Sequence, residues 1–136
     1  MKTVMVFGTF DLLHPGHVNF LQQAKKYGRL TLIIARDKTV KRLKGKLPQH
    51  SEKQRLKATK GLELAAKVML GSLTDKYAAI KKYQPDIICL GYDQIYFTDQ
   101  LKDEIKKIKL KTKIIRLKPY RTNKYKTSII KKIINN

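Results

Sequence analysis

Two histidines, His14 and His17, are the side chains in this sequence best suited to chemistry on a phosphorylated ligand. The two histidines are three residues apart, and residues with this spacing at the start of a helix lie on one face and can point at the same bound group. A neutral imidazole can donate a hydrogen bond near pH 7, which suits it to stabilising negative charge that develops on phosphate oxygens. We therefore predict that His14 and His17 form a pair of hydrogen-bond donors in an active site.

The residues around the two histidines predict a strand, a glycine turn and the start of a helix. Residues 4–7 form an apolar run that is typical of a short buried strand, and residues 18–26 fit a helix. Gly8 and Gly16 let the backbone approach a ligand, while Pro15 suits the first turn of a helix. The unpaired N–H groups of such a turn attract anions, so the layout is typical of a phosphate-binding site.

Other readings of the histidine pair are a zinc site or a purely structural role. Zinc needs further clustered ligands, whereas His50 and the lone cysteine, Cys89, are isolated in the sequence. Cys89 also lies in the apolar run 87–90, where it is expected to be a small core residue. We therefore predict no metal site built from protein side chains.

The rest of the chain alternates between short apolar runs and helical patterns. Strands are predicted at residues 30–35, 68–71, 86–90 and 113–117, and helices at residues 51–65, 74–83, 98–108 and 128–134. Residues 38–48 carry many cations together with Gly45 and Pro48, and we expect a mobile basic loop there. The alternation predicts an α/β fold. We expect a single domain over residues 1–136, with a Rossmann-like doubly wound sheet of about five parallel strands and helices on both faces.

In sheets of this kind, ligands bind at the carboxyl ends of the strands. The glycine turns at Gly8, Gly71 and Gly91 lie at the carboxyl ends of predicted strands, and Asp37 comes just after another. These residues are therefore expected to meet at one edge of the sheet and to face a ligand.

The formal net charge of +21 calls for an anionic partner. A nucleic acid is one candidate, but the lysines are spread along the chain at helix-surface spacings, and the sequence carries no zinc-finger spacing or RNP-like aromatic motif. We expect a phosphorylated small molecule and no specific nucleic-acid binding. No apolar run approaches the roughly 18 residues of a membrane span, so we expect no membrane partner and a cytoplasmic protein.

The stretch Gly-Thr-Phe-Asp-Leu-Leu-His-Pro-Gly-His at residues 8–17 resembles the signature of the small nucleotidyltransferases that carry an H-x-G-H motif. Within that superfamily the chain is most similar to archaeal-type FAD synthases and glycerol-3-phosphate cytidylyltransferases. Residues 35–37, 43–46, 70–72 and 90–94 resemble the FAD synthases. Residues 121–128 match in part a tail pattern of the cytidylyltransferases.

The resemblance implies transfer of a nucleoside monophosphate from a triphosphate to a phosphorylated small molecule, with release of pyrophosphate. The catalytic residues that it implies are His14, His17, Lys44 and Asp11, of which Asp11 would orient a histidine or a lysine. The nucleotide would be bound by Gly8, Thr9, Phe10, His14, His17, Gly91, Asp93, Thr127 and Ser128. The acceptor side would include Asp37, Lys46, Arg55 and Arg121.

Two reactions remain open at this point. One is adenylyl transfer from ATP to FMN, giving FAD, and the other is CTP-dependent activation of glycerol 3-phosphate or a similar phosphorylated alcohol. Glu63 stands where the cytidylyltransferases carry an arginine for the acceptor phosphate, and the C-terminal cysteines of archaeal FAD synthases are absent. In either reaction Mg²⁺ would accompany the triphosphate, and the resemblance implies a homodimer. A basic nucleic-acid-binding protein with this fold is the third alternative.

Overall fold

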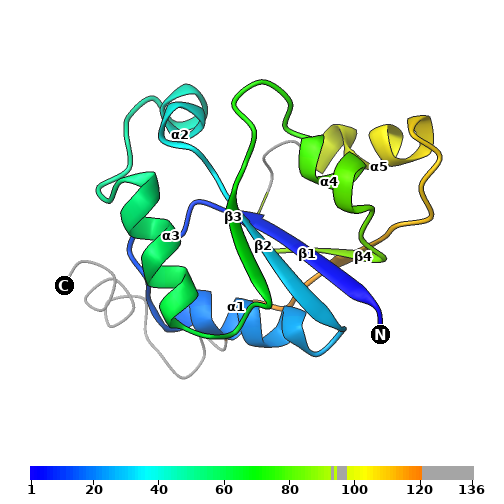
Figure 1. The fold of residues 1–136 in the computed structure, drawn as a ribbon, viewed down its shortest axis with the longest axis horizontal. Coiled ribbons are helices and arrows are strands. Elements are labelled where there is room, and N and C mark those ends of the chain that lie inside the picture. Colours follow the sequence, from blue (N-terminus) through cyan, green and yellow to red (C-terminus); the bar gives the residue numbers. More distant parts are fainter. Residues whose placement is uncertain (93, 95–97, 121–136) are drawn as a thin grey trace.

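The computed structural model of the protein describes residues 1–92, 94 and 98–120, and its strands form one parallel sheet (Figure 1). The strand order is β3-β2-β1-β4-β5, and every neighbouring pair is parallel. The strands are β1 (Thr3–Gly8), β2 (Arg29–Ile34), β3 (Lys67–Leu70), β4 (Ile87–Leu90) and β5 (Lys113–Arg116). The predicted five-stranded parallel sheet is thus confirmed. The predicted last helix at residues 128–134 lies outside the described residues.

Helices cover both faces of the sheet, as predicted. They are α1 (Pro15–Lys25), α2 (Asp37–Lys44), α3 (Glu52–Gly61), α4 (Ala78–Tyr83) and α5 (Thr98–Lys107). Helices α1 and α3 lie on one side of the sheet, and α4 and α5 lie on the other (Figure 1). Helix α2 sits beyond the ends of the strands, next to the segment that follows β3. None of the helices in the described part is both long and apolar enough to cross a membrane.

Alternation along the central strand divides the core into two layers. Val4 and Val6 face α1 and α3, whereas Met5 and Phe7 face α4 and α5. All four side chains are buried. A strand buried on both faces reads as a continuous apolar run, which explains why residues 4–7 show no polar alternation.

The start of α3 carries the predicted capping box, but the helix ends earlier than predicted. The side chain of Ser51 accepts a hydrogen bond from the backbone N–H of Gln54, whose own side chain accepts from the Ser51 N–H, so the predicted capping box is present. Helix α3 nevertheless ends at Gly61, short of residue 65. Glu63 takes a left-handed conformation with φ 55°, which turns the chain toward β3.

The prediction of a mobile loop at residues 38–48 was wrong for its first part, because Asp37–Lys44 form α2. Asp37 lies in the first turn of this helix and three cations lie in its last turn, which complements the helix dipole. Gly45 ends the helix in the left-handed conformation, with φ 82°. The glycine that indicated a loop is therefore a helix C-cap.

Helix α4 begins later than expected, at Ala78 instead of near Thr74. The Ser72 hydroxyl accepts hydrogen bonds from the backbone of Thr74 and Asp75, and the Asp75 carboxylate accepts one from the Tyr77 N–H. These contacts stabilise a turn where propensity alone favoured a helix.

Candidate active site

A cavity of about 880 Å³ opens at the carboxyl edge of the sheet. The turns after β1, β2, β3 and β4 contribute to its walls, together with the start of α1 and one side of α2. Its volume is within the range of small-molecule sites. The cavity lies where the strand order turns back between β1 and β4, which is where open α/β sheets bind ligands.

His14 and His17 both line this cavity, with their ring centroids 4.0 Å apart. His14 is the N-cap of α1, and its Nδ1 accepts a hydrogen bond of 3.1 Å from the Gly16 N–H. When Nδ1 is the acceptor, a neutral imidazole carries its proton on Nε2. The capping contact thus leaves His14 with an Nε2–H donor. A Cβ at Gly16 would lie 2.7 Å from Cε1 of this ring, so the glycine makes room for it.

His17 lies deeper than His14. Its ring packs 5.2 Å from the Phe10 ring, measured between centroids. Burial lowers the pKa of His17 to about 4, and the nearby His14 and Lys44 add to the lowering. Burial also lowers the pKa of His14. Both imidazoles are therefore neutral at pH 7, and each has one N–H to donate.

Phe10 shapes the turn that carries these histidines, which we call the histidine turn (residues 8–17). It is buried and holds a left-handed conformation with φ 52°, which is costly for a residue with a large side chain. Its ring folds back over Gly8, where an added Cβ would overlap the ring. Strain of this kind is kept where the surrounding structure over-determines it, as it often is at functional sites.

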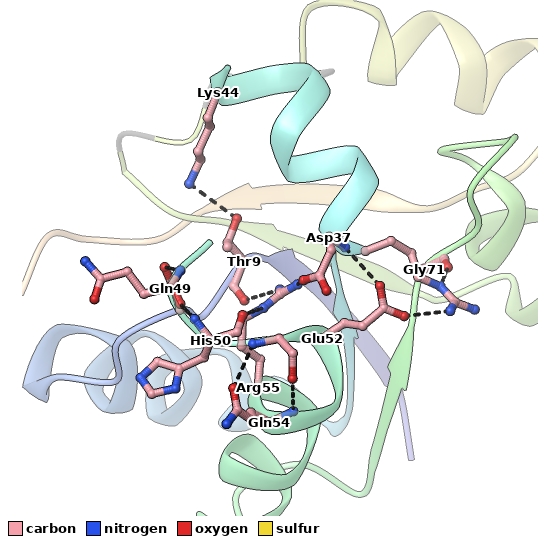
Figure 2. A network of polar contacts seen from close by, with 12 residues as sticks. Thr9, Asp37, Lys44, Gln49, His50, Glu52, Gln54, Arg55 and Gly71 are labelled. Atoms are coloured by element: carbon pink, nitrogen blue, oxygen red, sulfur yellow. Dashed lines mark hydrogen bonds and ion pairs between the residues drawn. The ribbon is translucent and has the colours of Figure 1, made fainter. Parts of the chain in front are cut away.

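Lys44 reaches the histidine turn from the end of α2. Its Nζ lies 3.3 Å from the Thr9 hydroxyl, and both residues line the cavity (Figure 2). One ligand in the cavity could therefore contact both Thr9 and Lys44. A cation at this point can neutralise phosphate charge next to the two imidazoles.

Arg55 lies differently from the expectation that it binds the acceptor. Its side chain is fully buried, and its guanidinium donates to the Thr9 carbonyl at 2.8 Å, to the His50 carbonyl at 3.0 Å and to the Asp37 carboxylate at 2.7 Å (Figure 2). Arg55 and Asp37 are both absent from the cavity wall. In this structure Arg55 holds together the histidine turn, the start of α2 and the segment before α3.

A second ion pair completes what we call the Arg55 cluster (Arg36, Asp37, His50, Glu52 and Arg55). Arg36 donates to the Glu52 carboxylate at 2.8 Å and to the Gly71 carbonyl at 2.8 Å. The other Glu52 oxygen accepts from the Asp37 N–H, the largest cause of the lowered pKa of Glu52. The cluster therefore fixes the ends of β1, β2 and β3 to α3 (Figure 2).

Asp11 also has different partners from those expected. Its two carboxylate oxygens accept hydrogen bonds of 2.8 Å from the backbone N–H groups of Gln49 and His50, and no side-chain histidine or lysine is among these partners. Asp11 thus connects the histidine turn to the segment that leads into α3. Of the remaining predicted residues, Gly91 lines the cavity, whereas Lys46 is exposed and lies outside its wall. Asp93, Arg121, Thr127 and Ser128 lie outside the described residues.

Four cations that the sequence reasoning missed also line the cavity, namely Arg36, Arg42, Lys76 and Lys118. Lys118 comes two residues after the end of β5, so the rule on strand ends could have found it. Arg42 was missed because the loop prediction gave residues 38–48 no fixed position, whereas helix α2 places Arg42 at the cavity wall. Lys76 belongs to the unpredicted turn before α4, and no sequence signal pointed to it.

Comparison with known proteins gives a consistent result. The cytidylyltransferase-like family model matches residues 5–133. The FAD synthase of Methanohalophilus mahii is 42% identical over 137 residues, which cover 98% of this chain and 95% of that protein. The FAD synthase of Methanothermobacter thermautotrophicus is 42% identical over 125 residues, covering 89% of this chain and 82% of that protein.

Solved structures show the same fold. The crystal structure of the lipopolysaccharide core biosynthesis protein from Thermoplasma volcanium superposes with a TM-score of 0.82 at 38% identity, over 88% of this chain and 98% of that one. Pantoate-beta-alanine ligase from Francisella tularensis, at 13% identity and a TM-score of 0.59, shares the fold over 89% of this chain and 61% of that one. The histidine turn, the parallel sheet and these matches lead to one conclusion: this chain belongs to the cytidylyltransferase-like family.

Proposed function

We propose that this protein is an FAD synthase that transfers AMP from ATP to FMN and releases pyrophosphate. The observation that carries the proposal is the likeness to FAD synthases, about 42% identity over nearly the whole chain. It is supported by a histidine turn whose two neutral imidazoles face a cavity of suitable size.

In this reaction an oxygen of the FMN phosphate attacks the α-phosphorus of ATP. A new P–O bond forms to that oxygen, the bond from the α-phosphorus to the bridging oxygen breaks, and pyrophosphate leaves with the bonding electrons. No covalent protein intermediate is needed, so the protein contributes alignment and charge stabilisation. His14 and His17 donate to phosphate oxygens, Thr9 and the backbone of the histidine turn bind the triphosphate, and Lys44 neutralises charge between the two substrates.

The wall of the cavity suits an acceptor with a large apolar ring system. Ile33, Val40, Leu43 and Ala79 line the part of the cavity between α2 and α4, and Leu43 is half exposed there. Tyr92 is also exposed at the wall. An isoalloxazine ring would bury the exposed surface of Leu43 and Tyr92, whereas glycerol 3-phosphate has no apolar group of that size.

We propose that Mg²⁺ enters with the triphosphate. In the described part of the chain no three His, Cys, Asp or Glu side chains are grouped as a metal site. Mg²⁺ in phosphoryl-transfer sites is commonly held by substrate phosphates and water with few protein ligands, and this arrangement fits such a site.

The decisive experiment measures pyrophosphate release with Mg²⁺, crossing ATP and CTP with FMN and glycerol 3-phosphate, and identifies FAD by mass. We expect turnover with ATP and FMN alone. Turnover only with CTP would move the protein to the cytidylyltransferase reaction, and absence of turnover in all four mixtures would contradict both. A homodimer in the cytoplasm stays a prediction, which light scattering and cell fractionation test.

A further inference from the structure

The two halves of the sheet separate at the cavity, between β1 and β4. Strand β1 pairs with β2 along six residues, from Thr3 with Arg29 to Gly8 with Ile34. Its pairing with β4 covers only Val4 with Ile87 and Met5 with Ile88. The carboxyl ends of β1 and β4 therefore reach the cavity without backbone hydrogen-bond pairing between them. Something else must set their separation, because both turns line the cavity.

The side-chain amide of Gln94 bridges this gap. Its Nε2 donates to the Phe7 carbonyl at 3.0 Å, and its Oε1 accepts from the Gly91 N–H at 3.2 Å. Phe7 is near the end of β1, and Gly91 directly follows β4. One amide group thus contacts both strand ends, in the way that a peptide group contacts both neighbours inside a sheet.

Arg116, the last residue of β5, fixes the backbone that carries this amide. Its Nη1 donates to the Gly91 carbonyl at 2.7 Å and to the Gln94 carbonyl at 3.0 Å. The Gln94 N–H in turn donates to the Gly91 carbonyl at 3.1 Å. Hydrogen bonds from a guanidinium are stronger than those between neutral groups. Arg116 therefore holds the turn after β4 at two points, the carbonyls of Gly91 and Gln94.

We propose that Gln94 is a positioning residue for the transfer reaction, with Arg116 as its support. The amide sets the distance between the histidine turn after β1 and the turn after β4, so that a triphosphate held by the first is aligned with a nucleoside held by the second. This inference rests on the proposed function for its kinetic readout. Its structural readout, the protection of the Gly91 amide, is independent of any activity.

The first test replaces Gln94 with methionine, which keeps the length of the side chain and removes both contacts. Misplacement of reacting groups by an ångström can lower rates by about 100-fold, so we expect kcat to fall by about 10-fold to 100-fold while the KM for FMN changes little. Exchange of the Gly91 amide hydrogen, followed by NMR, should become faster. The control is Gln22→Met, an exposed glutamine of α1, which should leave both readouts unchanged.

Gln94→Glu separates the two contacts. The carboxylate still accepts from the Gly91 N–H, but it cannot donate to the Phe7 carbonyl. We expect slow exchange at Gly91 to persist while kcat falls as in Gln94→Met. If both variants turn over like the wild type, or if Gly91 exchange is unchanged in Gln94→Met, the proposal is wrong.

Arg116→Met provides a second route if Gln94→Met does not fold. It should also speed Gly91 exchange and lower kcat, and the double variant should be no slower than the slower single variant, because both act through one turn. Multiplying effects would contradict the proposal. If the wild-type protein makes no FAD, the proposed function fails, yet faster Gly91 exchange in Gln94→Met and Arg116→Met would still support the bridge.

Discussion

The histidine turn and the Arg55 cluster meet at Thr9, but they use their polar groups in opposite ways. In the histidine turn the Thr9 hydroxyl and both imidazoles line the cavity. In the Arg55 cluster the charged groups bind one another. The buried guanidinium of Arg55 donates its hydrogen bonds to the carbonyls of Thr9 and His50 and to the Asp37 carboxylate. The histidine turn faces the cavity, and the Arg55 cluster holds that turn in place. A cation close to the cavity therefore need not be available to a ligand, because its hydrogen bonds can all go to the protein.

The strongest test of this contrast is His17→Asn, which keeps a polar side chain but removes the imidazole. We expect kcat to fall by about 100-fold to 1,000-fold, the range for loss of one hydrogen-bond donor that stabilises charge in the transition state. The melting temperature should stay close to that of the wild type, because His17 belongs to the ligand-facing region. Pyrophosphate release and a thermal melt followed by circular dichroism measure the two quantities. A large loss of stability with full activity would reverse the assignment.

Asp37→Asn should act in the opposite sense, on stability before chemistry. It leaves the buried Arg55 charge without its counter-charge, and removing one partner of a buried ion pair costs about 3 kcal/mol or more. Urea unfolding measures this change. The matched control is Asp103→Asn on the exposed side of α5, where we expect a change within about 0.5 kcal/mol. Equal effects of the two variants would contradict a structural role for Asp37.

Lys44→Ala should lower kcat/KM by about 10-fold to 100-fold, since hydrogen bonds that involve charged groups contribute about 1.5–3 kcal/mol. Stability should hardly change, because Lys44 is exposed at the end of α2. Lys41→Ala on the same helix is the control, since Lys41 is exposed but does not line the cavity. Similar losses in both variants would indicate a general charge effect in place of a specific contact.

The smallest expected effect is on the pH dependence of stability. Because burial lowers the pKa of His17 to about 4, the native protein leaves this group neutral where the unfolded chain protonates it, below its ordinary pKa of 6.5. The free energy of unfolding should therefore fall as the pH drops from 6.5 to about 4. His17→Asn should show a shallower fall in that window. Urea midpoints at several pH values measure the difference, and parallel curves would contradict the buried, neutral state of His17.

The part of the fold that the sequence predicts best is the sheet. Continuous apolar runs such as residues 4–7 have few alternatives to a buried strand, so all five strands appear within a residue or two of the predicted positions. Helix α2 was missed because Gly45 and many lysines resemble a loop when the chain is read locally. Its N-terminus is held by Glu52 and Arg55, contacts that come from another helix and leave no local signal.

The site was predictable where spacing determines geometry and not where it depends on tertiary packing. His14 and His17 meet because residues three apart share one face at the start of a helix. For Arg55 the sequence gives a cation near a phosphate site, and only the folded chain shows that the side chain is buried. The bridge made by Gln94 joins residues 87 positions apart, which no local pattern indicates.

The Phe10 ring lies where a side chain at position 8 would be, so the effects of substitutions at positions 8 and 10 depend on each other. With Phe10 in place, a side chain at position 8 has no room, so Gly8→Ala should be rejected in this background. After Phe10 has been replaced by a smaller residue, the same exchange loses its obstacle. The order of the two substitutions therefore decides whether the intermediate variant is destabilised. As long as Phe10 is present, its ring keeps position 8 a glycine.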